Sequence, residues 1–462
     1  MQQLKKITND QLKLTIDNHK LWLENKEEHK DKRADFNHTD LIKAQLSGFD
    51  LSQAIFTGAN LMGANLKNSI LSGANFKEAN LVHTNFSYTN LSQAILSDTI
   101  LTQANLKNAC LDNADFSGAY LHKTILNEAN VRGASFKRAN LIDASFQNAK
   151  LKTSDFSNAS LGATNFTKSD LTDTNFNNTY LCDAIFTKST LTNANFNNAN
   201  LCYAQFDFSK LHSANLSFTN LNQASFIEVD FTEAQLDDAN FKGAKIKNST
   251  FFKASLKRAN LEELSLININ FQETNLTEAN FENSNLSKSS FYKSNLNKVN
   301  LNKTNLNETT FLDSNLSQSH INHAQLNKTN FSNAQLQESN LNNSNIIDTN
   351  FSNVQIETIN FKDSSIDLLT YNKSKWDSTP GILLSLFEKG ALFCNECEKI
   401  ILKLKEELLF KEKEAQAKAE KEKSILEEKQ KKLLQQEQEK LSIEAEKKTF
   451  LGKIKYFLKD SF

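Results

Sequence analysis

A large apolar residue recurs at every fifth position from Phe36 to Tyr371. All 68 of these central positions hold Leu, Phe, Ile, Val or Tyr, and the residue two places before each of them is Ala, Ser or Thr in 60 cases. A helix would repeat its apolar positions every 3.6 residues and a strand every two, so neither explains a strict period of five. A short repeat that stays in phase over this length indicates a solenoid, in which stacked repeats share one continuous core.

The residue types at successive positions of the repeat are also specific. Residues 59–63 read ANLMG, residues 64–66 read ANL, and residues 74–76 read ANF. This pattern resembles the A-(N/D)-L-x-x consensus of the pentapeptide-repeat family, and the resemblance covers about 336 of the 462 residues. It implies an all-β solenoid, a right-handed quadrilateral β-helix in which each pentapeptide forms one side and four successive pentapeptides form one coil. Residues 34–376 would then make about 17 coils.

The arrangement of residue types gives partial support for a coil of four repeats. Leucine occupies every fourth central position from Leu41 to Leu221, and phenylalanine does so from Phe231 to Phe351. A period of ten alone would also produce part of this sorting. Outward-facing charges of opposite sign recur at the same spacing, and we expect them to stack on neighbouring coils about 4.8 Å apart. Each exposed pair would contribute less than about 1 kcal/mol. The predicted stacks are Glu233, Lys253 and Glu273; Asp238, Arg258 and Glu278; Asp237 and Lys257; and Lys242 and Glu262.

Two further features predict local geometry. Seven of the eight glycines in the repeats fall two residues after a central position, and Gly162 does not. Glycine there is expected if that corner requires a positive φ. The position two residues before each centre, which we call the small position, holds a larger residue mainly late in the repeats. We therefore expect widened or distorted coils near 264–271 and 354–371. These larger residues are Val229, Leu264, Ile269, Val299, Val354, Ile359 and Leu369.

Residues 1–33 read as a capping helix. Thr8 offers an N-cap, and Leu12, Ile16, His19 and Leu23 share one helical face. A helix over the first coil would cover apolar side chains and unpaired backbone groups, although it could instead be a docking element.

The C-terminal region divides into a cap and a long helix. Residues 377–395 contain Pro380 and enough apolar residues to cover the last coil, and Trp376 is a possible last centre. Residues 396–462 read as a charged helix that is either a weak coiled coil or a solvated single helix. We favour a homodimer through residues 396–448. The amphipathic end could lie on an anionic membrane, dock a partner or fold back; its apolar residues are Phe450, Leu451, Ile454, Phe457 and Leu458.

The sequence predicts no catalytic, cofactor-binding or metal site. No phosphate-binding loop or nucleophile motif is present. The pair Cys394 and Cys397 is a lone CxxC, which lacks the further ligands of a zinc site unless two chains meet. Cys182 and Cys202 are one predicted coil apart, so we expect their Cα atoms to be about 4.8 Å apart and both thiols to be free. The histidines form no ligand set; they are His19, His29, His38, His83, His122, His212, His320 and His323.

Charge and composition narrow the possible functions. The formal net charge is −1, and residues 36–371 hold 25 Lys or Arg against 30 Asp or Glu. A basic group at 242–258 is neutralised by the stacked acids, so we do not expect nucleic acid as a partner. We find no signal peptide and no transmembrane stretch, and five cysteines do not suggest a disulfide scaffold, so a reduced, cytoplasmic protein is expected.

Three functions remain open. The first is a non-enzymatic scaffold whose rigid surface binds an unidentified protein partner. The second follows from the resemblance, because some pentapeptide-repeat proteins mimic duplex DNA and act on DNA gyrase; those are strongly acidic, which this chain is not. The third is a secreted, host-targeted effector with a membrane- or partner-binding tail.

Overall fold

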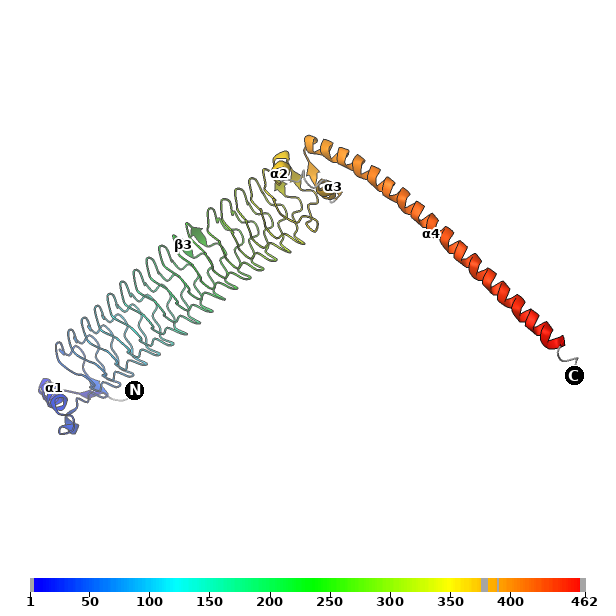
Figure 1. Cartoon of the computed structure of the whole chain (residues 1–462). Coiled ribbons are helices and arrows are strands. Elements are labelled where there is room, and N and C mark those ends of the chain that lie inside the picture. Colours follow the sequence, from blue (N-terminus) through cyan, green and yellow to red (C-terminus); the bar gives the residue numbers. More distant parts are fainter. Residues whose placement is uncertain (1–3, 375–380, 389, 458–462) are drawn as a thin grey trace. The chain divides into compact units, whose positions relative to one another are not determined.

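A computed structural model describes residues 4–374, 381–388 and 390–457 of the chain (Figure 1). The chain divides into two compact units, Met1–Cys394 and Asn395–Phe462. The first unit holds the repeats and the second is a single long helix. Each unit is described by itself.

The repeats form a parallel β-solenoid in which four pentapeptides make one coil. Parallel bridges join residue i to residue i + 20, from Asp35 and Ile55 to Asn340 and Asn360. Through most of the solenoid the central N–H donates to a carbonyl one coil further on, as from Phe176 to the C=O of Asn195 at 2.6 Å. The predicted coil period is therefore confirmed. Longer strands occur at a few places only: β1 (Lys5–Lys6), β2 (Thr39–Asp40), β3 (Ser225–Ile227), β4 (Lys245–Lys247), β5 (Asn345–Ile346), β6 (Ser365–Ile366) and β7 (Leu392–Phe393).

The central residues fill the interior of the solenoid. Phenylalanine rings on successive coils stack face to face, with centroids 5.1 Å apart for Phe156 and Phe176 and 4.8 Å apart for Phe176 and Phe196. The predicted later column is confirmed from Phe231 to Phe351, since each neighbouring pair along it is stacked. The core is thus a continuous column of side chains with the walls outside it.

The corners of the coils adopt the left-handed backbone conformation, as the glycine positions indicated. Gly48, Gly58 and Gly73 have φ values of 75°, 62° and 65°, and nearly every non-glycine residue at the same corner position also has a φ near 60°. Gly162 does not have a positive φ, and glycine is needed there for another reason. A Cβ atom at Gly162 would approach Cε1 of Tyr180 to 3.1 Å, so glycine there leaves room for a neighbouring ring.

Some corners of the solenoid exchange a hydrogen bond, and three of them hold a larger residue at the small position. At ordinary corners the N–H of the small residue donates to the preceding centre, as from Ala194 to the C=O of Leu191 at 3.0 Å. At three late positions it donates instead to a serine hydroxyl one coil further on. These bonds join Val229 to Ser249, Leu264 to Ser284 and Ile269 to Ser289, each at 3.0 Å. Val299, Val354 and Ile359 keep the ordinary bond, whereas Ala324 exchanges it although alanine is small.

The described bridges include none between Lys245 and Ser265, next to Leu264, so the expected distortion near 264–271 is confirmed there. The distortion at Val229, which accompanies β3 and β4, was not predicted. Near the C-terminal end, Val354 is only half-buried. The described bridges include none between Gln335 and residue 355, so the expected distortion from residue 354 is also confirmed.

The prediction that the repeats continue to residue 376 is wrong for the residues after Asp367. Residues Leu368–Lys373 form helix α2 instead, so Tyr371 is not the centre of a β-helix side. Asp367 is the N-cap residue, and its carboxylate accepts the N–H of Thr370 at 2.8 Å. A capped helix avoids placing Leu369 at the small position. Trp376 and Pro380 lie outside the described residues.

The C-terminal cap follows α2. Helix α3 spans Gly381–Glu388, and β7 pairs in parallel with β6. Leu386 and Ala391 are buried, whereas Phe387 and Leu392 are exposed. The apolar residues expected to cover the last coil therefore do so only in part.

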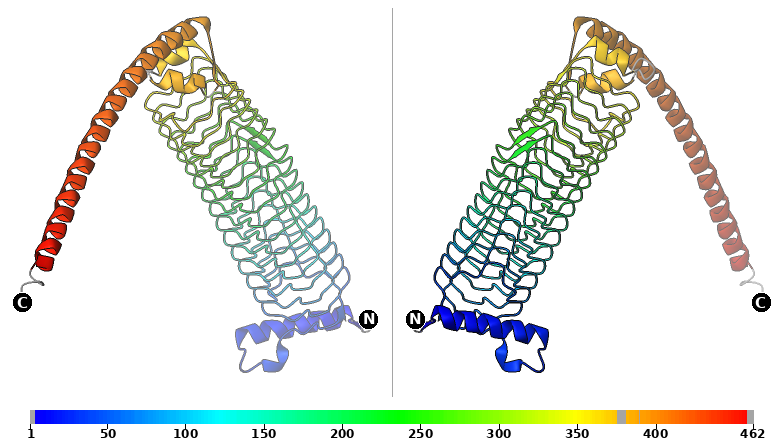
Figure 2. Two further views of the ribbon diagram at one scale, coloured as in Figure 1. Left: turned by 90° about the vertical axis from the view of Figure 1, so that its right-hand side faces the viewer. Right: turned by 90° about the vertical axis from the view of Figure 1, so that its left-hand side faces the viewer.

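The N-terminal helix α1 (Asn9–Glu24) lies across the first coil of the solenoid (Figure 2). Thr8 caps it in a complete capping box with Gln11. Beside it, β1 pairs in parallel with β2 and supplies one rung beneath the first coil. The short 3₁₀ helix η1 (Lys30–Lys32) then leads into the repeats.

His19 attaches α1 to the solenoid through both ring nitrogens. Nδ1 accepts the N–H of Ala34 at 3.0 Å, and Nε2 lies 3.1 Å from the C=O of Ser52, to which it donates. The ring stacks on Trp22 at 5.1 Å and is fully buried. Only the neutral ring can accept at Nδ1 and donate at Nε2.

We expect acidification to loosen α1. Burial lowers the pKa of His19 below 6.5; a nearby Asp50 opposes this, and Arg33 and Lys26 add to it. Because the folded pKa is below the unfolded one, the docked state is fully favoured above about pH 6.5 and loses stability as the pH falls below it. The change is measured as a shift in Trp22 fluorescence in a Trp376→Phe background between pH 7.5 and 5. A His19→Gln variant should lose this pH dependence; if it responds as the wild type does, His19 is not the responsible group.

The second unit is helix α4 (Asn395–Phe457). Cys397 and Ile401 near its start are buried, whereas Ile425, Leu433 and Leu441 of the expected seam are exposed. No helix among the described residues is long and apolar enough to cross a membrane.

Candidate functional site

The ionisable residues of the described chain do not converge on a reactive centre. Within that part of the chain, no group of three or more His, Cys, Asp or Glu side chains could hold a metal ion. Cys394 is half-buried and Cys397 is buried. The outer walls of the solenoid are therefore the surfaces to consider.

Charges on these walls are paired between neighbouring coils. Four predicted contacts are present: Arg258 with Asp238 at 2.6 Å, and Lys253 with Glu273, Lys257 with Asp237 and Lys242 with Glu262, each at 3.8 Å. The hydrogen bond from Arg258 to Asp238 raises the pKa of the arginine. These pairs are exposed and contribute little to stability, but they cancel the basic group at 242–258 locally.

The position before each centre forms ladders of asparagine. Along one wall the same column holds Asn200, Asn220, Asn240, Asn260, Asn280 and Asn300. The Asn220 amide donates to Asn200 and the Asn300 amide to Asn280, both at 2.9 Å. Their side-chain oxygens also accept backbone N–H groups two residues on, as from Asn222 to Asn220 at 3.2 Å. Both roles occupy groups that a ligand would otherwise use.

One coil carries an unusual set of corner residues. Tyr203, Phe208 and Phe218 have φ values of 59°, 62° and 60°. Their side chains are 57%, 46% and 57% exposed. The left-handed region is unfavourable for bulky side chains, and most corners of this solenoid avoid them, although Tyr88 is an isolated example on another coil. We call Tyr203, Phe208 and Phe218 the aromatic corners.

The sequence does distinguish this coil, but only at the position two residues after each centre, which lies outside the pattern of centres. The corner residue is the one two places after each centre. At most corners this residue is Asn, Asp, Glu, Lys or Gly. The aromatic residues occupy three of the four corners of a single coil, and Ser213 occupies the fourth. Such exposed aromatic side chains are typical of protein-binding surfaces.

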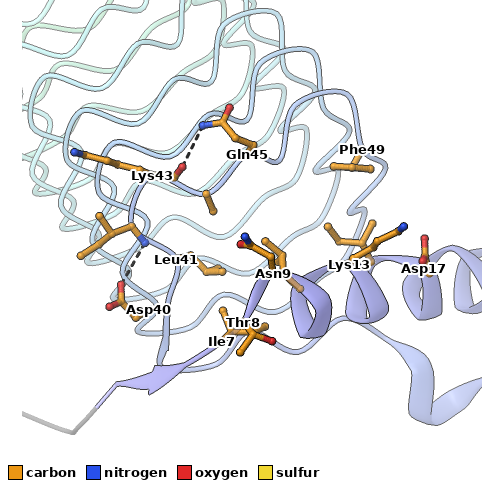
Figure 3. A pocket seen from close by; sticks show the side chains of 14 residues that line it. Ile7, Thr8, Asn9, Lys13, Asp17, Asp40, Leu41, Lys43, Gln45 and Phe49 are labelled. Carbon is orange, nitrogen blue, oxygen red and sulfur yellow. Dashed lines mark hydrogen bonds between the residues drawn. The ribbon is translucent and has the colours of Figure 1, made fainter.

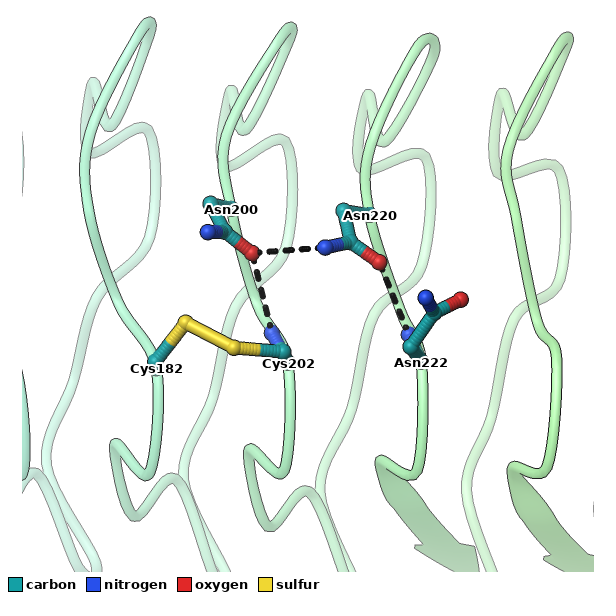
Figure 4. The surroundings of a disulfide bond; sticks show 5 residues. All are labelled: Cys182, Asn200, Cys202, Asn220 and Asn222. Atoms are coloured by element: carbon teal, nitrogen blue, oxygen red, sulfur yellow. Dashed lines mark hydrogen bonds between the residues drawn. A yellow bond between two sulfur atoms is a disulfide. The ribbon is translucent and has the colours of Figure 1, made fainter.

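A disulfide bond lies beside the aromatic corners. Cys182 and Cys202 are bonded, with their Cα atoms 4.6 Å apart (Figure 4). The predicted separation is confirmed, but the expectation of free thiols is wrong. The coil period places both side chains at the same wall position one rung apart, which is within the Cα separation that a disulfide requires. Tyr180 and Tyr203, both exposed, are close to it in sequence on the same two coils.

Loss of the disulfide should weaken the middle of the solenoid. The bond closes a loop of about 20 residues, for which chain entropy predicts a contribution of about 3 kcal/mol. We expect a Cys182→Ser/Cys202→Ser variant to unfold at lower denaturant concentration by that amount, and dithiothreitol to have no further effect on it. Cys110→Ser is the matched control, because Cys110 is bonded to no other cysteine. An unchanged midpoint in the double variant would contradict the prediction.

Comparison with protein families identifies the repeats. The model described as "Pentapeptide repeats (8 copies)" matches residues 32–58, 59–98, 186–217 and 209–248. The model described as "Pentapeptide repeat region" matches residues 99–176, 234–311 and 285–361. The matches together extend over most of the solenoid. Comparison with curated proteins found no matching sequence.

The solved structures that this chain matches include several pentapeptide repeat proteins. HetL, involved in heterocyst differentiation regulation in the cyanobacterium Nostoc sp. strain PCC 7120, is 26% identical; the alignment covers 47% of this chain and 90% of HetL, with a TM-score of 0.32. Rfr23 from the cyanobacterium Cyanothece 51142 is 27% identical over 31% of this chain and 97% of its own, with a TM-score of 0.16. The plasmid-mediated fluoroquinolone resistance protein QnrB1 is 14% identical over 43% and 95%, with a TM-score of 0.23.

Proposed function

The chain belongs to the pentapeptide repeat family, and from that premise we propose that it is a non-enzymatic scaffold that binds a protein partner on its outer wall. We further propose that the solenoid is a right-handed quadrilateral β-helix of about 17 coils. A filled core leaves only the walls, the corners and the ends of the solenoid for recognition. This assignment requires no reactive centre.

The observation that carries the proposal is the set of aromatic corners. Folding gains little from large rings that are about half exposed and held at a positive φ. Binding gains more, because aromatic side chains supply large contact area and dominate the energy of many protein interfaces. Lys188 lies 5.7 Å from the centre of the Phe208 ring, which adds a cation beside the apolar surface.

A site-specific photo-crosslinking amino acid at position 218 tests the proposal in the cells that make the protein. The matched control places the same amino acid at Lys298, which has the same corner position four coils further along. We expect a discrete crosslinked species from position 218 and none from position 298. No crosslink from position 218, or equal labelling at both positions, would contradict a binding surface at the aromatic corners.

We propose that the chain forms a homodimer through residues 396–448. Helix α4 leaves Leu426, Leu433, Leu434 and Leu441 at least 59% exposed. Apolar residues on one face of a long helix are usually covered by a second helix. A Leu426→Glu/Leu433→Glu variant should sediment as a monomer, whereas Lys418→Glu should sediment as the wild type does; identical sedimentation of all three would exclude this interface.

The amphipathic end of α4 is proposed to contact a membrane or a partner. Phe450, Leu451 and Ile454 are exposed in the described helix. The side chain of Phe457 and the whole of Leu458 lie outside the described residues. Flotation of the full chain with anionic vesicles, compared with a Phe450→Glu/Leu451→Glu variant, tests the membrane contact.

A secreted effector is the second candidate, and the disulfide favours it. Disulfides persist mainly in oxidising environments, whereas the composition led us to expect a reduced, cytoplasmic protein. Quenching cells in acid and labelling the thiols with maleimide would distinguish these compartments. An oxidised Cys182–Cys202 pair supports export, and two labelled thiols support a cytoplasmic location. DNA mimicry remains the weaker alternative, because the wall charges are paired and nearly balanced.

A further inference from the structure

The N-terminal end of the solenoid is only partly covered by its cap. Between α1 and the first coil lies a cavity of about 550 Å³ (Figure 3). Its apolar lining comes from both elements and consists of Ile7, Leu12, Ile16, Leu41, Ile42, Ala44 and Phe49. Gln45, which forms the outer side of the first coil here, also lines it.

The backbone of Gln45 has an open edge facing this end. Between coils, the residue before each centre donates its N–H to the coil before it, as from Asn65 to the C=O of Ala44 at 2.9 Å. The centre of the earlier coil donates in return, as from Leu46 to the C=O of Asn65 at 2.8 Å. Gln45 belongs to the first coil, and within the described residues neither its N–H nor its C=O has a hydrogen-bond partner.

The adjacent side of the same coil shows how such an edge is completed. There β1 pairs in parallel with β2, and the N–H of Lys5 donates to the C=O of His38 at 2.8 Å. An extended segment beneath Gln45 would continue the rung that β1 begins. The groove is thus continuous with an existing strand addition on the same end of the solenoid.

Two side chains around the cavity are more exposed than nearly all others at the same position of the repeat. Phe49 occupies the small position, where 60 of 68 residues are Ala, Ser or Thr, and it is 40% exposed. Ala44 occupies the same position in the preceding side and is half-buried, whereas the alanines at this position elsewhere in the solenoid are buried. An apolar side chain placed in the cavity would cover both.

The charges around the cavity are balanced. Lys13 and Asp17 lie next to each other on α1, and Lys43 and Asp40 lie on the coil side of the cavity (Figure 3). A strongly charged ligand would gain little here. Recognition would instead depend on backbone hydrogen bonds and one apolar side chain.

We propose that this groove binds an extended, uncharged peptide segment of a partner protein by parallel strand addition to Gln45. A large aliphatic side chain of the peptide enters the cavity between Leu12, Ile16 and Phe49. Its N–H donates to the C=O of Gln45, and the N–H of Gln45 donates to the carbonyl two residues earlier in the peptide. This site is separate from the aromatic corners and from α4, so the test of this proposal does not depend on the outcome of theirs.

A ten-residue peptide copying residues 57–66 is a suitable probe. It has no charged side chain, and it contains Asn65 and Leu66 of the strand that pairs with the other edge of Gln45 in the solenoid. The full chain carrying Leu426→Glu/Leu433→Glu is titrated with it, so that α4 contacts do not interfere. N-methylation of the peptide leucine that corresponds to Leu66 removes the donor to Gln45 and should weaken binding by at least about tenfold. N-methylation of the asparagine that corresponds to Asn65 changes an amide that points away and should leave binding within about threefold.

The matching protein variant is Phe49→Ala, which restores a residue typical of the small position. It should keep the thermal stability of the parent and weaken the peptide by about tenfold, whereas Phe252→Ala on a distant wall should not. Equal binding of the two methylated peptides, unchanged binding to Phe49→Ala, or no binding at millimolar peptide would overturn the proposal. Self-association of the parent that Phe49→Ala abolishes would identify a second copy of the chain as the occupant and would also overturn it.

Discussion

Replacing Phe176 with alanine is expected to lower the free energy of unfolding by about 3–5 kcal/mol. The ring is fully buried between the stacked rings of Phe156 and Phe196. It also meets Phe166 and Phe186 edge to face at 5.7 and 5.9 Å. Rungs above and below are held by backbone ladders, so the walls cannot collapse to fill the cavity. Chemical denaturation followed by circular dichroism measures the loss.

Phe252→Ala is the matched control for this change. It removes the same ring from the outer side of the wall, where Phe252 is only half-buried and lies 5.1 Å from the ammonium group of Lys253. We expect a loss below about 1 kcal/mol there, because the ring lies on the outer wall and its removal leaves no enclosed cavity. Comparable losses at the two positions would mean that the centres do not form the main core.

Substitution of the aromatic corners is expected to separate binding from folding. Tyr203→Asn, Phe208→Asn and Phe218→Asn should each change the free energy of unfolding by less than about 1 kcal/mol, since relief of the left-handed backbone offsets the lost contacts. Loss of a central aromatic residue typically weakens an interface by about 2 kcal/mol or more, which is at least about thirtyfold in affinity. The triple variant should therefore remain folded and no longer yield the partner complex formed by the wild type.

The reverse substitution provides the control. Asn198→Phe places a ring at the corner that precedes Phe218 by one coil, where the chain has asparagine at a φ of 58°. It should fold and bind the partner as the wild type does, because the ring lies outside the coil that carries the aromatic corners. If the triple variant unfolds at markedly lower denaturant concentration, the aromatic corners serve folding, and their assignment to recognition is wrong.

Much of the described fold follows from local rules that the sequence displays directly. The period of five identifies inward-facing centres, and the recurrence of residue types at every fourth repeat anticipates the stacked Phe231–Phe351 column and the ion pairs of Asp237 and Asp238. These succeed because each coil contacts only its neighbours, so one short pattern determines the same geometry at every rung. The N-cap at Thr8 is equally local.

Other features depend on what two distant segments do when they meet. No repeat pattern shows that Ser249 accepts the N–H of Val229, that both nitrogens of His19 are used, or that Cys182 and Cys202 form a bond. The end of the repeats was misplaced for a related reason. Apolar residues continue in phase through Tyr371, but a helix capped by Asp367 competes successfully with one more coil.

The sequence by itself determined the solenoid and its filled core, because both depend on the period of five along the chain, and the family resemblance implied the coil of four repeats. Only the tertiary structure showed where partners have room to bind. The aromatic corners are recognised as a binding surface only when the φ and the exposure of their residues are known together. The groove beside Gln45 exists because α1 covers one part of the first coil and leaves another part open. Exposure and unpaired backbone edges are properties of the assembled coils, so no single repeat contains them.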